Sequence, residues 1–400
     1  MPVLFPAAVE GAASAAVYGY GPLYMRQVLD EPRLTVTTLM LALAALAWFF
    51  AAGAWGRAGD RARRPLGLIG WALLLSAAVQ AALPFVPGSA AFIGLVVLWA
   101  CLLAAVAPLS VSWLTLQAPE RPAEEAAGFY RMRSVGWTVG SMGAGLLVGL
   151  MDLDGIPAAI LITAAASAVV GVAVLVAMRR GVAPVSAARP EAAAAAGEPG
   201  PGATSTSTVV HEGESGGSVW RLHAVWTLAA VILLTVTGNE AFFAVLGPYL
   251  TEYLPGSLEY VGLSMGVASF LGIGVVGPLG RLADRWGAER VFVLGCLGYV
   301  IMYGLVALLR DPLATVILFG LPIFPFMSTG ATGTLARRTP ARRRGEAIGA
   351  YEGTSALAGA VGSVLGGTVA DTAGLAVVPV MSFVLAVGGL LVAWTRLRPA

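Results

Sequence analysis

One short pattern occurs twice in this chain, and the repeat constrains the fold more than any other feature. Residues Gly56–Arg61 read Gly-Arg-Ala-Gly-Asp-Arg, and residues Gly280–Arg285 read Gly-Arg-Leu-Ala-Asp-Arg, 224 positions later. A second pair, Val139–Gly145 and Val361–Gly367, is separated by 222 positions. Matches in the same order at nearly constant spacing indicate that the chain consists of two structurally repeated halves.

The composition places these halves in a membrane. Apolar residues make up 58% of the chain and charged residues only 12%, whereas about 25% of a soluble domain is charged. Apolar stretches of about 20 residues, long enough to cross a hydrocarbon core of about 30 Å, recur from end to end. We therefore predict an all-α membrane protein with twelve transmembrane helices in two pseudo-symmetric six-helix bundles. The predicted spans are 4–25, 34–55, 66–86, 91–114, 129–151, 156–178, 223–250, 258–281, 288–309, 313–335, 347–369 and 374–396.

A polar segment divides the two bundles. Residues 181–220 are rich in Ala, Pro, Gly, Ser and Thr and contain too few bulky apolar residues to fold. We predict an N-terminal bundle of residues 1–180, a disordered cytoplasmic linker of residues 181–220, and a C-terminal bundle of residues 221–400. His211 and His223 lie in or beside this linker without a carboxylate or cysteine cluster, so we expect no metal site there.

The basic residues predict the orientation of the helices. The chain contains no lysine, so all 24 basic residues are arginines. With the N-terminus inside, every arginine except Arg26, Arg33 and Arg310 falls on a cytoplasmic segment, and the positive-inside rule then places both termini in the cytoplasm of a cell (inner) membrane. The absence of lysine excludes the Gly-x-x-x-x-Gly-Lys phosphate-binding sequence of ATP-driven pumps. A net charge of +2 gives no indication of a nucleic-acid partner.

The doubled pattern resembles the signature of the major facilitator superfamily of secondary transporters, Gly-x-x-x-Asp-Arg-x-Gly-Arg-Arg. The second copy has Gly287 after its Asp-Arg pair, and the first copy lacks that glycine. The resemblance implies that the loop stabilises an outward-facing state through contacts between the halves. The alternative is that these charges only mark the cytoplasmic surface. The residues of this candidate gating motif are Gly56, Asp60, Arg61, Gly280, Asp284 and Arg285.

A second motif points to one branch of that family. Residues Phe129–Gly136 contain Arg-x-Arg-x-x-Gly, which resembles the sugar and nucleoside proton symporters, including the lactose permease. The resemblance implies that Arg133 contacts the substrate. The acidic partner that this branch carries on its fourth helix is missing, because Ala107–Ser112 offers only hydroxyls. The alternative is that Arg131 and Arg133 form an ordinary cytoplasmic flank.

Glycine and proline predict local features of the helices. Glycines recur on the predicted helices 129–151 and 347–369, where they favour close helix packing. Pro322 and Pro325 are expected to bend the predicted helix 313–335.

Two acids lie inside the predicted spans, where a charge costs at least about 2.5–3.5 kcal/mol. They are Glu10 in the first helix and Glu240 in the seventh, and in the resembled family these two helices line the central cavity. We predict that Glu240 exchanges the coupling proton and that Glu10 is the second proton-coupling acid. The alternative for Glu10 is a wetted, inert position near the cytoplasmic end. Besides Arg133, the candidate substrate-binding residues are Tyr18, Gln80, Trp137, Asn239 and Glu352.

These observations predict a transporter rather than an enzyme. We expect a monomer that needs no cofactor and moves a small organic solute across the lipid bilayer by alternating access, coupled to protons. A proton-driven drug or metabolite efflux antiporter is the first alternative, and a transport-inactive membrane sensor or scaffold is the second.

Overall fold

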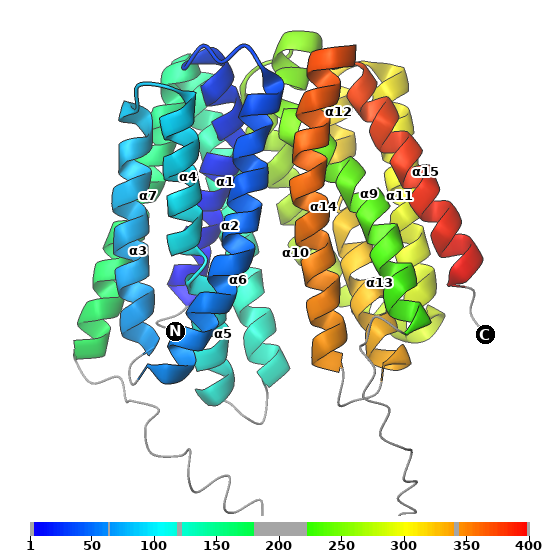
Figure 1. Ribbon diagram of the computed structural model, residues 1–400, viewed down its shortest axis with the longest axis horizontal. Coiled ribbons are helices and arrows are strands. Elements are labelled where there is room, and N and C mark those ends of the chain that lie inside the picture. Colours follow the sequence, from blue (N-terminus) through cyan, green and yellow to red (C-terminus); the bar gives the residue numbers. More distant parts are fainter. Residues whose placement is uncertain (1–3, 63–64, 118–121, 180–221, 340–343, 398–400) are drawn as a thin grey trace, which may run out of the picture.

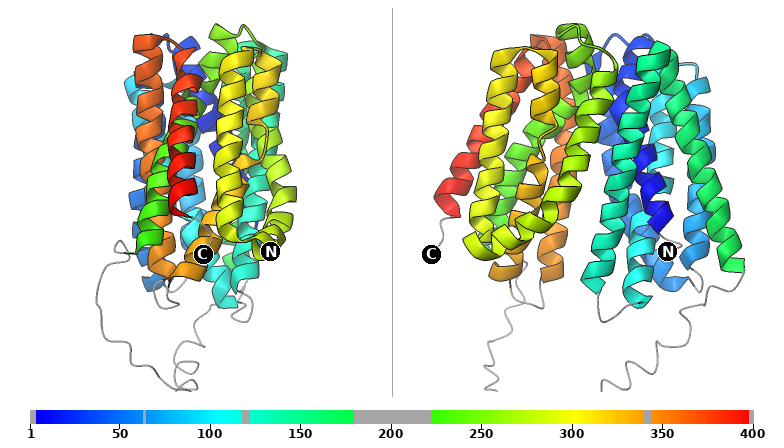
Figure 2. Two further views of the ribbon diagram at one scale, coloured as in Figure 1. Left: turned by 90° about the vertical axis from the view of Figure 1, so that its right-hand side faces the viewer. Right: turned by 180° about the vertical axis from the view of Figure 1, so that it is seen from behind.

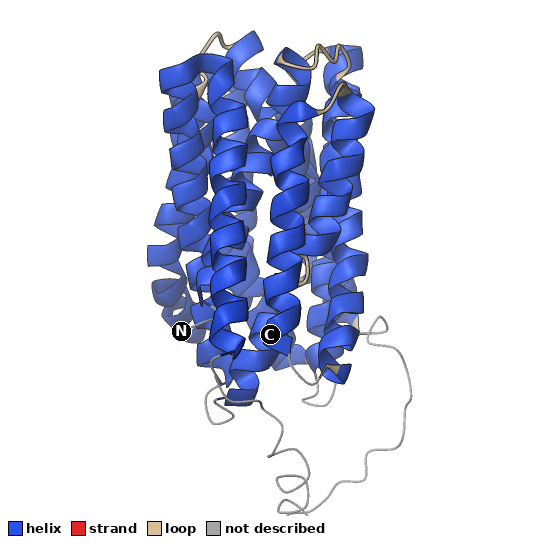
Figure 3. Cartoon of the chain, turned by 90° about the vertical axis from the view of Figure 1, so that its left-hand side faces the viewer, coloured by secondary structure: helices blue, strands red, loops and turns tan. Residues whose placement is uncertain are grey.

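The computed structural model describes residues 4–62, 65–117, 122–179, 222–339 and 344–397. These residues form helices joined by short loops, and none of them lies in a strand. The predicted linker falls outside the described residues. Figure 3 shows that the long helices run between two faces of the molecule, where most of the described loops are found.

The N-terminal bundle has seven α-helices among its described residues, with two short 3₁₀ helices between them. The α-helices are α1 (Leu4–Gln27), α2 (Leu34–Arg61), α3 (Pro65–Ala82), α4 (Ser89–Leu103), α5 (Val106–Gln117), α6 (Pro122–Met151) and α7 (Gly155–Arg179). The 3₁₀ helices are η1 (Leu83–Phe85) and η2 (Asp152–Asp154).

The C-terminal bundle repeats this order. Its α-helices are α9 (His223–Pro248), α10 (Glu259–Trp286), α11 (Ala288–Leu309), α12 (Pro312–Phe319), α13 (Ile323–Arg338), α14 (Arg344–Ala373) and α15 (Val377–Arg396). A π-helical segment, η4 (Tyr249–Tyr253), continues α9.

The fourth helix of each repeat is broken in the middle. α12 ends at Phe319 and α13 begins at Ile323, so the predicted bend at Pro322 is confirmed. In the first repeat α4 ends at Leu103 and α5 begins at Val106. Pro108 lies four residues after Ala104, and a proline ring clashes with the carbonyl four residues before it. The break in the first repeat was not predicted, although Pro108 was its signal.

Ten candidate membrane spans are found among the described residues by length and hydropathy. One of them, Gly128–Arg179, contains α7 and the part of α6 from Gly128 onward, and α1 is not among the ten. The spans Ser89–Leu114 and Pro312–Leu335 each join the two parts of a broken helix. The chain is therefore a multi-pass membrane protein, and the number of twelve crossings stays a prediction.

The two bundles stand side by side (Figure 1). The face that carries Leu4 and Leu397 is called the termini face here, and the other is the opposite face. Across the junction α14 packs on α2 and α10 packs on α6. Figures 1 and 2 show that the bundles converge toward the opposite face and diverge toward the termini face.

Candidate functional site

Close packing of α1 on α6 builds the first part of the site. A Cβ at Gly136 would overlap the carbonyl oxygen of Ala8, and a Cβ at Gly140 would lie 2.5 Å from the backbone of Ala12. Only glycine allows the two helix backbones to approach this closely. This close contact places Glu10 of α1 beside Arg133 of α6.

Glu10 and Arg133 form an ion pair within the N-terminal bundle. Arg133 Nε lies 2.9 Å from Glu10 Oε1, the Glu10 side chain is fully buried, and the Arg133 side chain is 34% exposed. The second carboxylate oxygen, Oε2, has no hydrogen-bond partner among the described residues. Glu10 is therefore not at a wetted position, and Arg133 finds its acidic partner on α1 rather than on the fourth helix.

The exposed side of Arg133 faces an aromatic ring and a second acid. Its guanidinium carbon lies over the ring of Trp48 on α2, 5.7 Å from the ring centroid, a cation–π arrangement. Glu352 on α14 is close enough for its charge to interact with that of Arg133. Arg133 thus lies where the two bundles face each other, with Glu10 behind it and Glu352 on the other bundle.

The C-terminal bundle repeats the same construction. A Cβ at Gly366 of α14 would meet the carbonyl oxygen of Ala241 on α9, and one at Gly362 would lie 2.5 Å from the carbonyl oxygen of Thr237. The close approach places Glu240 against α14, where a Cβ at Gly359 would lie 3.8 Å from Glu240 Cγ. In both repeats, therefore, an acid of the first helix is positioned by glycines of the fifth.

Glu240 is hydrogen-bonded rather than ion-paired among the described residues. Asn239 Nδ2 donates to Glu240 Oε1 at 3.2 Å, and Tyr303 Oη donates to Asn239 Oδ1 at 2.9 Å. The Tyr303 ring stacks on Tyr299 with centroids 6.1 Å apart and an interplanar angle of 9°. This chain of hydrogen bonds fixes the orientation of Asn239 and of the carboxyl beside it.

Gln80 lies apart from these groups, in the core of the N-terminal bundle. It donates to the carbonyl oxygen of Ile160 at 3.1 Å and to Thr163 Oγ1 at 2.8 Å, and it accepts from Trp99 Nε1 at 3.2 Å. Its hydrogen-bonding capacity is largely used within α3, α4 and α7.

Two aromatic candidates flank the ion pair. The ring of Tyr18 meets that of Trp99 edge to face, with centroids 5.3 Å apart. Trp137 is partly buried and lies one helical turn beyond Arg133 on α6. Both side chains pack against the apolar core.

The candidate gating motif lies at the termini face. The Asp60 side chain is outside the described part of the chain. A Cβ at Gly56 or Gly280 would meet nothing within 4 Å, and Arg61, Asp284 and Arg285 are exposed. No hydrogen bond or ion pair joins Arg61, Asp284 or Arg285 to the other bundle among the described residues.

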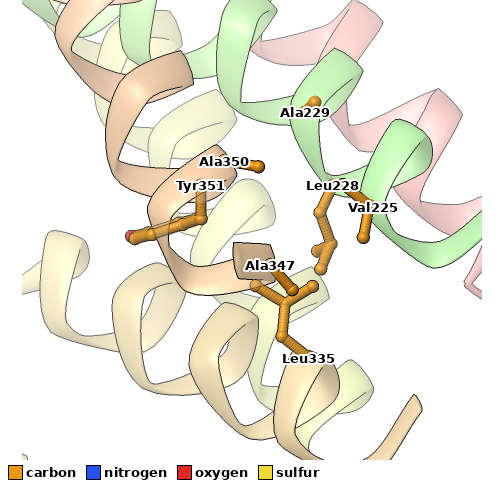
Figure 4. A pocket seen from close by; sticks show the side chains of 7 residues that line it. All are labelled: Val225, Leu228, Ala229, Leu335, Ala347, Ala350 and Tyr351. Atoms are coloured by element: carbon orange, nitrogen blue, oxygen red, sulfur yellow. The ribbon is translucent and has the colours of Figure 1, made fainter. Parts of the chain in front are cut away.

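A small apolar pocket opens near the termini face of the C-terminal bundle (Figure 4). Its lining comes from α9, α13 and α14, and the Tyr351 hydroxyl points away from the other lining side chains. The lining residues are Val225, Leu228, Ala229, Leu335, Ala347, Ala350 and Tyr351. Because no charged group lines it, this pocket does not contribute to the ion chemistry of Glu10, Arg133 and Glu240.

Sequence reasoning missed two residues of this arrangement and one pairing. Trp48 and Tyr303 were not among the candidates, and Glu10 and Arg133 were assigned to separate roles. The small residues Gly11, Gly136 and Gly140 were the available signal, since they predict that α1 and α6 touch. No group of three or more His, Cys, Asp or Glu side chains that could hold a metal ion occurs among the described residues.

Comparisons with known proteins agree with the fold. The family model described as Major Facilitator Superfamily matches residues 3–363. A stretch of 71 residues is 39% identical to the uncharacterized MFS-type transporter Rv0849 of Mycobacterium tuberculosis (strain ATCC 25618 / H37Rv) and covers 17% of this chain and 17% of that protein.

Solved transporter structures share the fold at low sequence identity. The nucleoside transporter NupG has a TM-score of 0.72 at 12% identity, over 99% of this chain and 97% of that chain. A bacterial homolog of the human lysosomal transporter Spinster has a TM-score of 0.76 at 11% identity, over 99% and 96% of the two chains. A POT family transporter in complex with 5-aminolevulinic acid has a TM-score of 0.75 at 12% identity, over 99% and 94%.

Proposed function

The chain belongs to the major facilitator superfamily, and on that premise we propose that it is a secondary active transporter. It moves a small organic solute across the membrane by alternating access, with the two bundles rocking against each other. Transport is coupled to protons through Glu10 and Glu240. The described ion pair lies within one chain, so a monomer is sufficient for this cycle.

The arginine distribution supports a cytoplasmic termini face. Arg26, Arg33 and Arg310 lie at the end of α1, the start of α2 and the end of α11, which all reach the opposite face. The remaining arginines belong to the segments that the positive-inside rule assigns to the cytoplasm. With this orientation the bundles touch on the outer side and diverge on the cytoplasmic side, so the conformation corresponds to an inward-facing state in the cell (inner) membrane.

The buried ion pair of Glu10 with the partly exposed Arg133 carries the proposal. A solute with a hydrogen-bond acceptor or an anionic group can bind the exposed side of the guanidinium and compete with Glu10 for it. A buried carboxylate that loses its partner costs several kcal/mol unless it is neutralised. Binding a proton on Glu10 removes that cost, so solute and proton bind together, which favours symport over efflux by exchange.

Glu240 is proposed as the main coupling acid, in the other bundle. Among the described residues, the Glu240 carboxyl accepts a hydrogen bond from the neutral Asn239 side chain, which in turn accepts one from Tyr303. In the absence of a cation partner, a proton is the group that can balance this carboxylate. Its orientation by Asn239 keeps the carboxyl in one place while it takes up and releases the proton.

Uptake and efflux in proteoliposomes test the proposal. A panel of small organic solutes is offered with and without an imposed pH gradient, and at least one solute is expected to accumulate along the inward proton gradient. Replacement Arg133→Gln should abolish accumulation, whereas Arg131→Gln, two residues away on an exposed position of the same helix, should not. Proton-driven extrusion instead of accumulation would establish the efflux alternative, and no solute movement in either direction would contradict the proposal.

A further inference from the structure

The N-terminus of α2 lacks a cap of its own. The helix begins at Leu34, and the residue before it, Arg33, makes no side-chain capping hydrogen bond. The first N–H groups of a helix have no partner within the helix and need an acceptor from elsewhere. Arginine is a donor only and cannot supply that acceptor.

Asp371 of the other bundle supplies it. Asp371 Oδ1 accepts from the backbone N–H of Leu34 at 2.8 Å. Its Oδ2 accepts from the backbone N–H of Thr35 at 2.8 Å and from Thr35 Oγ1 at 2.6 Å. One carboxylate at the end of α14 therefore caps a helix that begins 337 positions earlier in the chain, and the positive end of the α2 dipole favours its charge.

A glycine one turn earlier on α14 makes this contact possible. A Cβ at Gly367 would overlap Thr38 Oγ1 and lie 2.7 Å from the carbonyl oxygen of Leu34. Gly367 and Asp371 are four residues apart and lie on one face of α14. The glycine lets the two helices touch, and the aspartate bonds to the helix end that the contact exposes.

The other repeat has a corresponding contact. Gly145 on α6 matches Gly367 in the repeated sequence, and a Cβ there would lie 3.1 Å from the carbonyl oxygen of Glu259 at the start of α10. Tyr20 Oη of α1 accepts from the backbone N–H of Gly262, in the first turn of α10, at 2.8 Å. In both repeats, then, the first turn of the second helix is bonded by an acceptor from the opposite bundle.

An exposed ion pair lies on the same side of the molecule. Arg26 at the end of α1 meets Glu252 of η4 through two hydrogen bonds of 3.0 and 3.2 Å, and both side chains are 28% exposed. Surface pairs of this kind contribute little to stability. The Asp371 carboxylate accepts three hydrogen bonds, two of them from backbone N–H groups at the positive end of a helix, so it is the stronger of the two contacts.

We propose that Asp371 and the first turn of α2 form a latch that holds the bundles together at the opposite face, with Tyr20 and Gly262 as its weaker counterpart. The inference rests on the proposed alternating access. Opening the opposite face must break all three Asp371 hydrogen bonds at once and return the uncapped end of α2 to water. The latch therefore sets the balance between the state seen here and the state open on the opposite face.

Distance measurements between spin labels test the latch without reference to transport. Labels are placed on Ala90→Cys at the start of α4 and Val377→Cys at the start of α15, two exposed positions at the opposite face of the two bundles, in a background without Cys101 and Cys296. Asp371→Asn keeps the size of the side chain but loses its charge and one acceptor. We expect the population with the longer label distance to rise about five- to tenfold, from the loss of a negative charge at a helix N-terminus and of its charge-assisted hydrogen bonds.

Asp311→Asn is the matched control. Asp311 also caps a helix at the opposite face, accepting from the backbone N–H of Ala314 at 2.7 Å, but this contact lies within one bundle. The control should leave the label distances unchanged. Thr35→Val, which removes one of the three donors, should shift them in the same direction as Asp371→Asn by a smaller factor.

Two results would overturn the latch. One is unchanged label distances in both Asp371→Asn and Thr35→Val, and the other is an equal shift in Asp311→Asn. Because the readout is a distance, a protein that moves no solute but shows the expected shift contradicts the proposed function and leaves the latch standing. A protein that transports solute but shows no shift in label distance contradicts the latch and leaves the proposed function standing.

Discussion

The two members of the central ion pair are in unequal surroundings. Glu10 is fully buried, whereas Arg133 is 34% exposed and can also reach water or the Trp48 ring. Loss of the arginine leaves a buried carboxylate with no partner, and loss of the carboxylate leaves an arginine that still has one. The Arg133 guanidinium is therefore the member of the ion pair that can change partners.

Thermal unfolding in detergent of single and double variants tests this asymmetry. Arg133→Met, which keeps the length of the side chain, should lower the free energy of unfolding by about 2–4 kcal/mol, toward the lower part of the range for breaking a buried pair because the arginine is partly exposed. Glu10→Gln should cost less. The double variant should be more stable than the sum of the two predicts, and strict additivity would show that the pair is not coupled.

The hydrogen bond from Tyr303 to Asn239 should matter for proton coupling. Tyr303→Phe removes a hydroxyl that donates to Asn239 Oδ1 at 2.9 Å while keeping the ring stacked on Tyr299. We expect a loss of stability of about 1 kcal/mol and fewer protons moved per solute, because Asn239 no longer holds the Glu240 carboxyl in one orientation. Proton flux and solute uptake measured on the same vesicles give this ratio.

Tyr299→Phe is the control for that variant. No hydrogen bond from the Tyr299 hydroxyl is found among the described residues, so its removal should leave the ratio of protons to solute unchanged. An equal change in both variants would mean that loss of any hydroxyl in this stack disturbs the site.

Single residues of the site were predictable from sequence, but their partners were not. An acid inside an apolar span is conspicuous, so Glu10 and Glu240 were found, and Arg133 followed from a family motif. Partners depend on which helix faces touch, and Glu10 and Arg133 are 123 positions apart. Asp371 was missed because a carboxylate near a helix end looks like an ordinary surface residue until the uncapped N-terminus of α2 is placed beside it.

At the level of elements, glycine spacing decides which helices form the site. α1 packs on α6 and α9 packs on α14 through glycines that a larger side chain would push apart. Because the acids lie on the first helix of each pair, this packing positions both of them. The glycines that recur in the two halves of the sequence therefore determine where Glu10 and Glu240 lie.

Two alanine substitutions on α6 test this packing. A Cβ at Gly140 would lie 2.5 Å from the backbone of Ala12, whereas a Cβ at Gly143 would meet nothing within 4 Å. Gly140→Ala should destabilise the protein by about 1–3 kcal/mol through overpacking, and Gly143→Ala should be neutral or slightly stabilising, since alanine favours helix. Thermal unfolding of both variants measures the difference. Equal stability of the two would mean that α1 and α6 do not touch as described.

The helix breaks show how far sequence predicts an element. Pro322 and Pro325 indicated the bend between α12 and α13, and the break is where they placed it. In the first repeat Pro108 lies inside α5, four residues after the break, so the continuous apolar sequence around Ala104 concealed it. A proline ring clashes with the carbonyl four residues before it, so a proline within an apolar span predicts a helix break about one turn before the proline.

For the whole molecule, the packing separates fixed contacts from contacts that change. Glu10 and Arg133 belong to one bundle and move together when the bundles rock. Glu352 belongs to the other bundle, as does Asp371 relative to α2. In the proposed cycle, closing the termini face therefore changes the surroundings of the Arg133 guanidinium, and opening the opposite face breaks the Asp371 contacts.

The repeated halves and their membrane location were predictable because they depend on composition and on sequence matches along the whole chain. The conformation was not, since the closed opposite face depends on contacts between residues that are far apart in the chain, such as Asp371 with Leu34 at 337 positions and Gly262 with Tyr20 at 242.

Solute-driven proton movement is the most direct test of the account. Protein in liposomes that contain a pH-sensitive dye is given a transported solute in the absence of any imposed gradient, and the internal pH is recorded for the wild type and for Glu240→Gln. The account predicts acidification of the interior with the wild type and a smaller pH change for the same amount of solute in the variant, in which only Glu10 can carry a proton. An unchanged pH response in Glu240→Gln would contradict it.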